Sequence, residues 1–278
     1  MSKNKKYNRN MNTYSVSQNF LTGRRVILKL IEKAKLKKDD MVLEIGAGKG
    51  HITKILAEKC DTVYAYEIDK RLYESLKKDM TDTAENVVLK YQDFLKAGLP
   101  EKGEYKVFAN IPFSQTTAII HKLIRDKNPP SESYLILEKG AAMRFCGKQR
   151  ETVQSLLLKP FYDVHIAAKI DRKEYHPMPS VDTAMLCIRK KAEPDLDRNE
   201  QTVFEQFVRE VKKRGVFGAQ ALLTKKQVST ALRLAKLPQI EKSAVMSYVQ
   251  WLCLFRCYRH FHGNRKNLKM ADDFKSKA

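Results

Sequence analysis

Six short apolar runs alternate with amphipathic segments between residues 40 and 190, and this alternation restricts the fold more than any other feature of the sequence. The runs are rich in β-branched and aromatic residues, which favour strands. The intervening segments place apolar residues three or four positions apart, as amphipathic helices do. Strands and helices in alternation form a largely parallel sheet with helices on both faces. We therefore predict an α/β fold with strands in the runs 41–48, 62–68, 86–93, 105–111, 133–140 and 183–191.

The composition changes after Lys191. Residues 191–200 are polar and contain a proline and charges of both signs, which indicates a linker or a surface loop. The sequence beyond them has helical periodicity and no convincing strand. We predict four parts: a flexible basic N-terminus (1–15), an α/β domain (16–191), a small helical domain (200–265) and a disordered tail (266–278).

The chain is strongly basic. It contains 53 Lys and Arg against 32 Asp and Glu, a formal charge of +21, and both parts of the chain share the excess. Such a charge predicts a polyanionic partner, of which nucleic acid is the commonest. An anionic membrane surface would also suit the charge, but no run approaches the roughly 18 to 20 apolar residues that span a bilayer. Since no apolar stretch follows the basic N-terminus, we expect no signal peptide and a cytoplasmic protein.

The cysteines do not predict a metal site. They are five in number and mostly scattered, without paired C-x-x-C spacing. Cys253 and Cys257 are four positions apart and would share a helix face, but their neighbours are apolar and aromatic. We expect packed thiols there and predict no metal, because a free cysteine behaves as a small hydrophobic residue.

The stretch from Glu44 to Gly50 predicts a ligand site at the end of the first strand. Glycines at positions 46, 48 and 50 permit a tight turn and the close approach of a ligand, because no Cβ stands in the way. A dinucleotide fingerprint would have its third glycine one residue later. The spacing G-x-G-x-G after an acidic residue suits S-adenosylmethionine better, since that cofactor has no pyrophosphate.

Two further acids end neighbouring strands. Glu67 ends the second strand, where a carboxylate can accept hydrogen bonds from both ribose hydroxyls of the cofactor. Asp93 ends the third strand, where it can accept a hydrogen bond from the adenine amino group. Either acid alone would more often be a helix cap or a solvated charge. Their position at the same sheet edge favours a site, whereas Asp69 is expected to cap the helix that follows it.

The stretch Asn110-Ile-Pro-Phe113 follows the fourth strand on the same edge. The amide oxygen of Asn110 and the carbonyl of Ile111 could accept two hydrogen bonds from an exocyclic amino group. This matters because the lone pair of adenine N6 is delocalised into the ring, and holding both N–H bonds turns it toward an electrophilic methyl group. Pro112 stiffens the loop, and the ring of Phe113 offers a surface on which an extruded base can stack.

These motifs together resemble the Erm family of 23S rRNA adenine N6-methyltransferases. The resemblance rests on the stretches Gln18-Asn-Phe-Leu21, Glu44–Gly50, Glu67-Ile-Asp69, Gln92-Asp93, Asn110–Phe113, 137–145 and 174–183, and it covers about residues 14 to 260. It implies a Rossmann-like class I methyltransferase sheet with a small helical RNA-binding domain at its C-terminal side. Phe113 stands where the family commonly has Tyr, so a hydroxyl group is absent, and Tyr175 stands where Phe is commoner.

The resemblance implies the transfer of one or two methyl groups from S-adenosylmethionine to N6 of one flipped-out adenine in 23S rRNA. That modification gives resistance to macrolide, lincosamide and streptogramin B antibiotics. It implies a monomeric bacterial enzyme, a catalytic Asn110–Phe113 loop, and a base held between Phe113 and Tyr175. The implied cofactor contacts are Gln18, Asn19, Leu21, Glu44, Gly46, Gly48, Glu67, Ile68, Asp93, Phe94 and Asn110.

Three other functions fit parts of the sequence. A housekeeping dimethyltransferase of 16S rRNA shares the fold and the catalytic pattern, although its usual tetrad is Asn-Leu-Pro-Tyr. A non-catalytic nucleic-acid-binding relative would have no need of Glu44, Glu67, Asp93 and Asn110 together. A nicotinamide-dependent oxidoreductase is disfavoured by the glycine spacing and by the charge.

Overall fold

The computed structural model describes residues 19–80, 84–217, 221–241 and 245–262, and these form two compact units. Within the described ranges, the first unit contains residues 19–146 and 162–192, and the second contains 147–161 and 193–262. None of the helices in the described ranges is long and apolar enough to cross a membrane. The predicted N-terminal segment and C-terminal tail lie outside the described residues.

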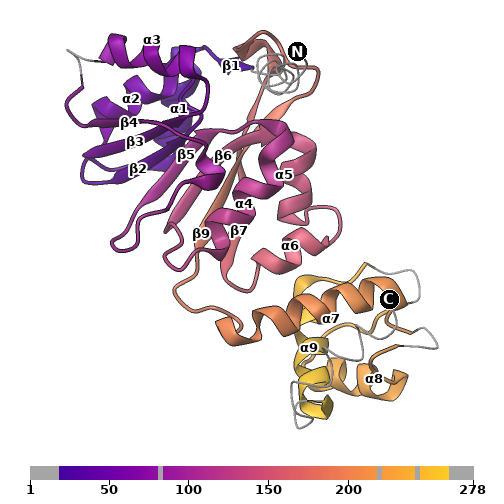
Figure 1. Cartoon of the computed structure of the whole chain (residues 1–278). Coiled ribbons are helices and arrows are strands. Elements are labelled where there is room, and N and C mark those ends of the chain that lie inside the picture. Colours follow the sequence, from indigo (N-terminus) through magenta and orange to yellow (C-terminus); the bar gives the residue numbers. More distant parts are fainter. Residues whose placement is uncertain (1–18, 81–83, 218–220, 242–244, 263–278) are drawn as a thin grey trace, which may run out of the picture. The chain divides into compact units, whose positions relative to one another are not determined.

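A seven-stranded sheet forms the centre of the first unit (Figure 1). Its first five strands run parallel, whereas β9 is antiparallel to β6, and β7 is antiparallel to β9. In spatial order the strands are β4 (Val87–Tyr91), β3 (Thr62–Glu67), β2 (Met41–Ile45), β5 (Lys106–Asn110), β6 (Glu132–Glu138), β9 (Thr183–Lys190) and β7 (Tyr162–Ile170).

Burial explains the pattern of the central strands. The middle of the sheet is covered on both faces, so β5 and β6 are almost continuously apolar and buried. One face packs on helices near the N-terminus, with Val63 and Phe108 in the shared core. Alternate residues such as Leu135 and Leu186 must point to the opposite face. The predicted α/β class is confirmed.

Within the described part of the chain, five helices flank this sheet. The N-terminal three, α1 to α3, contribute to the core on one face, and α5 contacts β6, β7 and β9. As predicted, the Asp69 carboxylate caps α3 by accepting hydrogen bonds from the backbone N–H groups of Arg71 and Leu72 (2.8 and 3.3 Å). The helices are α1 (Arg24–Ala34), α2 (His51–Lys59), α3 (Lys70–Met80), α4 (Thr116–Arg125) and α5 (Lys139–Cys146).

Short elements surround the carboxyl ends of the strands. Strand β1 (Phe20–Leu21) pairs antiparallel with β8 (Tyr175–His176) and forms a separate two-stranded sheet. Two 3₁₀ turns follow strands of the main sheet, namely η1 (Phe94–Lys96) and η2 (Phe113–Gln115); η3 (Arg172–Glu174) precedes β8.

The second unit is helical and has an aromatic core. Phe207 contacts Trp251, Phe255 and Tyr258, with ring centroids 5.3 to 6.4 Å apart. Such contacts contribute about 0.5 to 1.5 kcal/mol each beyond the burial of their area. Its elements are α6 (Val153–Leu158), η4 (Arg198–Glu200), α7 (Gln201–Arg214), α8 (Lys225–Leu234) and α9 (Tyr248–His262).

The division of the chain differs from the predicted domain boundaries in one segment. Residues 147–161 were expected within the α/β domain 16–191, but they belong to the second unit. Helix α6 buries its leucines and contacts α7, and Lys212 donates to the backbone carbonyl of Glu151 (2.8 Å). Glu151 is itself buried and paired with Lys159. Apolar periodicity alone does not show which core a helix joins. The sequence therefore did not indicate that residues 147–161 belong to the second unit.

Candidate active site

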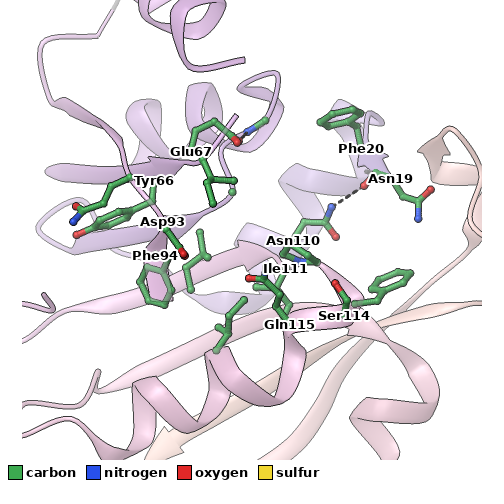
Figure 2. A pocket seen from close by; sticks show the side chains of 18 residues that line it. Asn19, Phe20, Tyr66, Glu67, Asp93, Phe94, Asn110, Ile111, Ser114 and Gln115 are labelled. Atoms are coloured by element: carbon green, nitrogen blue, oxygen red, sulfur yellow. Dashed lines mark hydrogen bonds between the residues drawn. The ribbon is translucent and has the colours of Figure 1, made fainter. Parts of the chain in front are cut away.

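A pocket opens at the carboxyl ends of β2, β3, β4 and β5 (Figure 2). Parallel strands bring their carboxyl ends to one edge of a sheet, which is where open α/β sheets bind ligands. The pocket is lined by Asn19, Phe20, Ile45, Gly46, Gly48, Tyr66, Glu67, Ile68, Gln92, Asp93, Phe94, Asn110, Ile111, Pro112, Phe113, Ser114, Gln115 and Ile119.

The glycine-rich loop forms one wall of the pocket. Gly46, Gly48 and Gly50 have φ values of 76°, 58° and 77°, which residues with a side chain rarely adopt. The backbone N–H groups of Gly46 and Ala47 both donate to the carbonyl of Tyr66 (2.9 and 3.0 Å), which fixes the turn against β3. A Cβ added at Gly46 would meet no described protein atom within 4 Å, so this backbone faces open space in the pocket.

Glu67 stabilises the same loop. Its side chain is buried, and its two carboxylate oxygens accept hydrogen bonds from the N–H groups of Gly48 (2.8 Å) and Asp69 (2.7 Å). Burial raises the pKa of Glu67, and these N–H bonds offset part of the rise. Each oxygen retains a further lone pair for a ligand hydroxyl.

Asp93, Phe94 and Ile68 form a neighbouring part of the wall. The Asp93 carboxylate accepts the N–H of Leu95 (2.9 Å) and caps η1, which leaves its second oxygen for another donor. The ring of Phe94 packs edge-on against Tyr66 at 5.4 Å, while Ile68 remains 40% exposed. A polar acceptor between aliphatic and aromatic surfaces suits a purine ring that has an exocyclic amino group.

Asn110 lies at the end of β5 in a fixed orientation. Its Nδ2 donates to the backbone carbonyl of Asn19 at 3.0 Å (Figure 2, dashed line). This hydrogen bond leaves the amide oxygen, Oδ1, as the acceptor at the end of the side chain. Pro112 follows with φ of −60°, and the half-buried Phe113 then begins η2 at the rim of the pocket.

Comparison with known proteins identifies the family. Residues 9–259 match the family described as ribosomal RNA adenine dimethylase. The chain belongs to this family. It is therefore an S-adenosylmethionine-dependent rRNA adenine N6-methyltransferase, and the predicted resemblance and cofactor are confirmed.

Individual relatives show the same relationship. A protein of Lysinibacillus sphaericus named rRNA adenine N-6-methyltransferase is 34% identical over 89% of this chain and 97% of its own length. A ribosomal RNA small subunit methyltransferase A of Mycoplasmopsis pulmonis is 33% identical over 64% of this chain and 71% of its own length. Among solved structures, the 23S rRNA methyltransferase ErmE has a TM-score of 0.76 and 28% identity, covering 86% of this chain and 99% of that one.

The residues present fit S-adenosylmethionine. The open backbone at Gly46 forms a cradle that a side chain would fill, and Glu67 and Asp93 supply oxygen acceptors on adjacent strands. Ile68 and Phe94 supply an apolar wall for the adenine ring. In this methyltransferase these residues would hold the nucleoside, and the glycine loop would accommodate the rest of the cofactor.

Three residues expected at the site lie outside the pocket lining. Leu21 is buried in the core at 2% exposure, and Glu44 is buried at 1% behind the glycine loop, so direct cofactor contact by either is not supported. The ring of Tyr175 is 4% exposed, and its hydroxyl is hydrogen-bonded to Oγ1 of Thr183 (2.8 Å). In this conformation Tyr175 cannot stack on a base, which corrects that prediction. Gln18 lies outside the described residues.

Several lining residues were not predicted as site residues. The signals for three of them were available, because Ser114 and Gln115 directly follow the Asn110–Phe113 stretch and Phe20 adjoins Asn19. Gln92 adjoins Asp93 in a quoted motif, and the others face the pocket because of the direction in which each side chain leaves its strand or helix. The unpredicted residues are Phe20, Ile45, Tyr66, Gln92, Ser114, Gln115 and Ile119.

Glu44 provides a prediction about stability. Burial, and secondarily the nearby Glu67, raise its pKa to about 8, and Thr53 offsets part of the rise. Among the described residues its Oε2 has no hydrogen-bond partner. The folded protein therefore keeps a proton that the unfolded chain releases near pH 4.3. The resulting stability is fully present below that pH and is lost as the pH rises to about 8.

We expect Glu44→Gln to flatten this dependence, because glutamine is neutral at every pH. Urea unfolding between pH 5 and 8 should show the free energy of unfolding of the unchanged protein falling by up to about 1.4 kcal/mol per pH unit relative to the variant. Glu151→Gln, a buried carboxylate in the second unit, serves as a comparison. Parallel curves for the unchanged protein and Glu44→Gln would show that Glu44 is ionised in the folded state.

Proposed function

We propose that this enzyme methylates N6 of a single flipped-out adenine in 23S rRNA and thereby gives resistance to macrolide, lincosamide and streptogramin B antibiotics. The observation that carries the catalytic part is the fixed Asn110 amide, whose Nδ2 is held by Asn19 while Oδ1 remains for the substrate. The choice of 23S rRNA is supported by the similarity to ErmE along 86% of the chain.

The chain's residues orient the adenine amine. S-adenosylmethionine, when bound, supplies an electrophilic methyl group. Oδ1 of Asn110 and the backbone carbonyl of Ile111 accept hydrogen bonds from the two N6–H groups, which draws the nitrogen lone pair out of conjugation with the ring and directs it toward that methyl group. The amine loses one proton to solvent after transfer, so no general base is required. Catalysis then arises from positioning and electrostatics.

The ring of Phe113 stacks on the base and thereby fixes its orientation. Stacking of a base on an aromatic ring contributes about 1 to 3 kcal/mol, which offsets part of the cost of extruding the adenine from its stack. Tyr175 could complete a sandwich only by leaving its buried site and its hydrogen bond to Thr183. We therefore assign the stacking role to Phe113 alone in this conformation.

A second candidate function is dimethylation of 16S rRNA. It is favoured by one observation, the 33% identity to a relative named for the ribosomal small subunit. Both candidates imply a cytoplasmic enzyme that acts on protein-free or nascent rRNA, and we expect a monomer. The same pocket serves both, so the RNA surface and not the chemistry distinguishes them.

The test is methyl transfer from labelled S-adenosylmethionine to protein-free 23S and 16S rRNA, side by side, with the modified nucleotide identified by mass spectrometry. We expect methylated adenine at one position of 23S rRNA and background label in 16S rRNA. Label confined to 16S rRNA would replace the proposal by the second candidate. Tight RNA binding without any label would contradict both candidates.

A further inference from the structure

A second groove lies wholly within the helical unit, at the N-terminal end of α8 and the C-terminal end of α9. The two helices are antiparallel, because Sγ of Cys253 contacts the carbonyl of Ala231 (3.5 Å) and Sγ of Cys257 contacts that of Gln227 (3.9 Å). The groove is lined by Phe217, Ala221, Leu222, Leu223, Thr224, Lys225, Gln227, Phe261 and His262.

The groove presents an exposed aromatic surface. Phe261 is 54% exposed, whereas Trp251, Phe255 and Tyr258 of the same helix are buried. His262 beside it is fixed, because its ring stacks on the buried Tyr258 with centroids 4.6 Å apart and an interplanar angle of 18°. Leu223, which is buried, provides an apolar floor. The ring of His260 packs at an angle of 83° to Phe261, with centroids 5.0 Å apart, and the exposed part of the Phe261 side chain is left available for a ligand of the groove.

The surroundings of the groove are positively charged. Helices α8 and α9 contain no Asp or Glu, and of their five Lys and Arg residues Lys225 and Lys226 lie at this end of α8, whereas Arg259 pairs with Glu200 (3.5 Å). Lys225 lines the groove and Lys226 follows it, and within the described ranges neither has an acidic partner. A ligand of this groove therefore combines a flat apolar face with negative charge.

We propose that this groove binds an unpaired nucleotide of the substrate RNA, with the base stacked on Phe261 and the adjacent phosphate near Lys225. An unpaired nucleotide has both features, whereas a duplex hides its base faces inside the stack. An acidic protein segment could pair with the lysines, but it would gain less from stacking on the ring of Phe261. The inference rests on the proposed function for RNA as the partner and adds a contact remote in sequence from the methylation loop.

The groove can be tested with the full chain and a labelled single-stranded RNA of about 12 nucleotides, within the range of single-strand site sizes. We expect Phe261→Leu to weaken binding about tenfold, because the ring face is lost while an apolar side chain remains. Phe261→Tyr should bind the RNA about as tightly as the unchanged protein does, since tyrosine keeps the aromatic ring. Ultraviolet crosslinking followed by mass spectrometry should place the RNA on the peptide that contains Phe261.

The matched control is Leu234→Ala, which changes another exposed apolar residue near the opposite end of α8. It should leave RNA affinity unchanged, and thermal unfolding should be the same for all variants because both positions are exposed. The proposal would be overturned if Phe261→Leu bound the RNA as tightly as the unchanged protein does. It would also be overturned if Phe261→Leu and Leu234→Ala lost the same RNA affinity, or if Phe261→Leu changed only the self-association of the protein. The binding test uses a short RNA and does not depend on methyl transfer to 23S or 16S rRNA. The groove proposal and the proposed function can therefore fail separately.

Discussion

Asn110→Ala is expected to lower kcat for methyl transfer by about 100- to 1000-fold, the range seen when one preorganised polar group is removed from a reacting centre. The variant lacks Oδ1, so the adenine amine keeps a single acceptor, the carbonyl of Ile111. Its lone pair then returns toward conjugation with the ring. Single-turnover transfer to rRNA at saturating cofactor would measure the chemical step directly.

Cofactor affinity separates this role from a structural one. Asn110→Ala should reduce S-adenosylmethionine affinity by less than about tenfold, since it removes at most one hydrogen bond to the cofactor. Ser114→Ala, at an exposed residue that lines the same pocket, should retain nearly full turnover. Wild-type turnover in Asn110→Ala would show that the amine is oriented by other groups.

Asn110→Asp tests the contribution of Asn19. Aspartate retains an acceptor oxygen but cannot donate to the Asn19 carbonyl, which now fixes the amide at 3.0 Å. Two oxygens would face each other, so the side chain should rotate away. We expect turnover between those of the unchanged enzyme and Asn110→Ala, and equality with the unchanged enzyme would show that the Asn19 contact has no role in catalysis.

The sheet was predictable where burial dominates. The runs that became β2, β3, β5 and β6 are apolar because helices cover both faces, and their parallel direction placed Glu67, Asp93 and Asn110 at one edge. Strand β7 was missed, because exposed residues interrupt its apolar pattern and a bulge between Ile166 and Ala168 breaks its period.

Some site residues were predicted wrongly for a similar reason, namely that their position depends on packing that the sequence does not show. A strand-end acid can be located from sequence, but whether its side chain lines the pocket depends on how far along the strand it lies. Glu44 precedes the last residue of β2 and does not line the pocket, whereas Glu67 on the same face of the sheet is the last residue of β3 and does. Tyr175 and Thr183 belong to one motif, but the sequence does not show that their hydroxyl groups are hydrogen-bonded or that Tyr175 joins the hydrophobic core. Which side chains of a motif are buried is determined by tertiary packing.

Gly46→Ala is expected to weaken S-adenosylmethionine binding by roughly 10- to 100-fold, because the added methyl group would occupy space that the cofactor needs. This space is open in the structure, since no described protein atom lies within 4 Å of that Cβ position. The φ of 76° also strains alanine and should cost about 1 to 2 kcal/mol of folding stability. Titration calorimetry with the cofactor, and urea unfolding without it, measure the two effects separately.

Gly103→Ala separates these causes. Gly103 has φ of 84°, and its Cβ would likewise meet no described atom within 4 Å, but it lies in the exposed loop before β5 and outside the pocket lining. Both variants should lose similar stability, and only Gly46→Ala should lose cofactor affinity. If the two bind the cofactor equally well, then the cofactor does not approach Gly46, and the positive φ serves only to turn the chain from β2 into α2. If the difference is found, absence of a side chain at Gly46 is a requirement of binding and not only of folding.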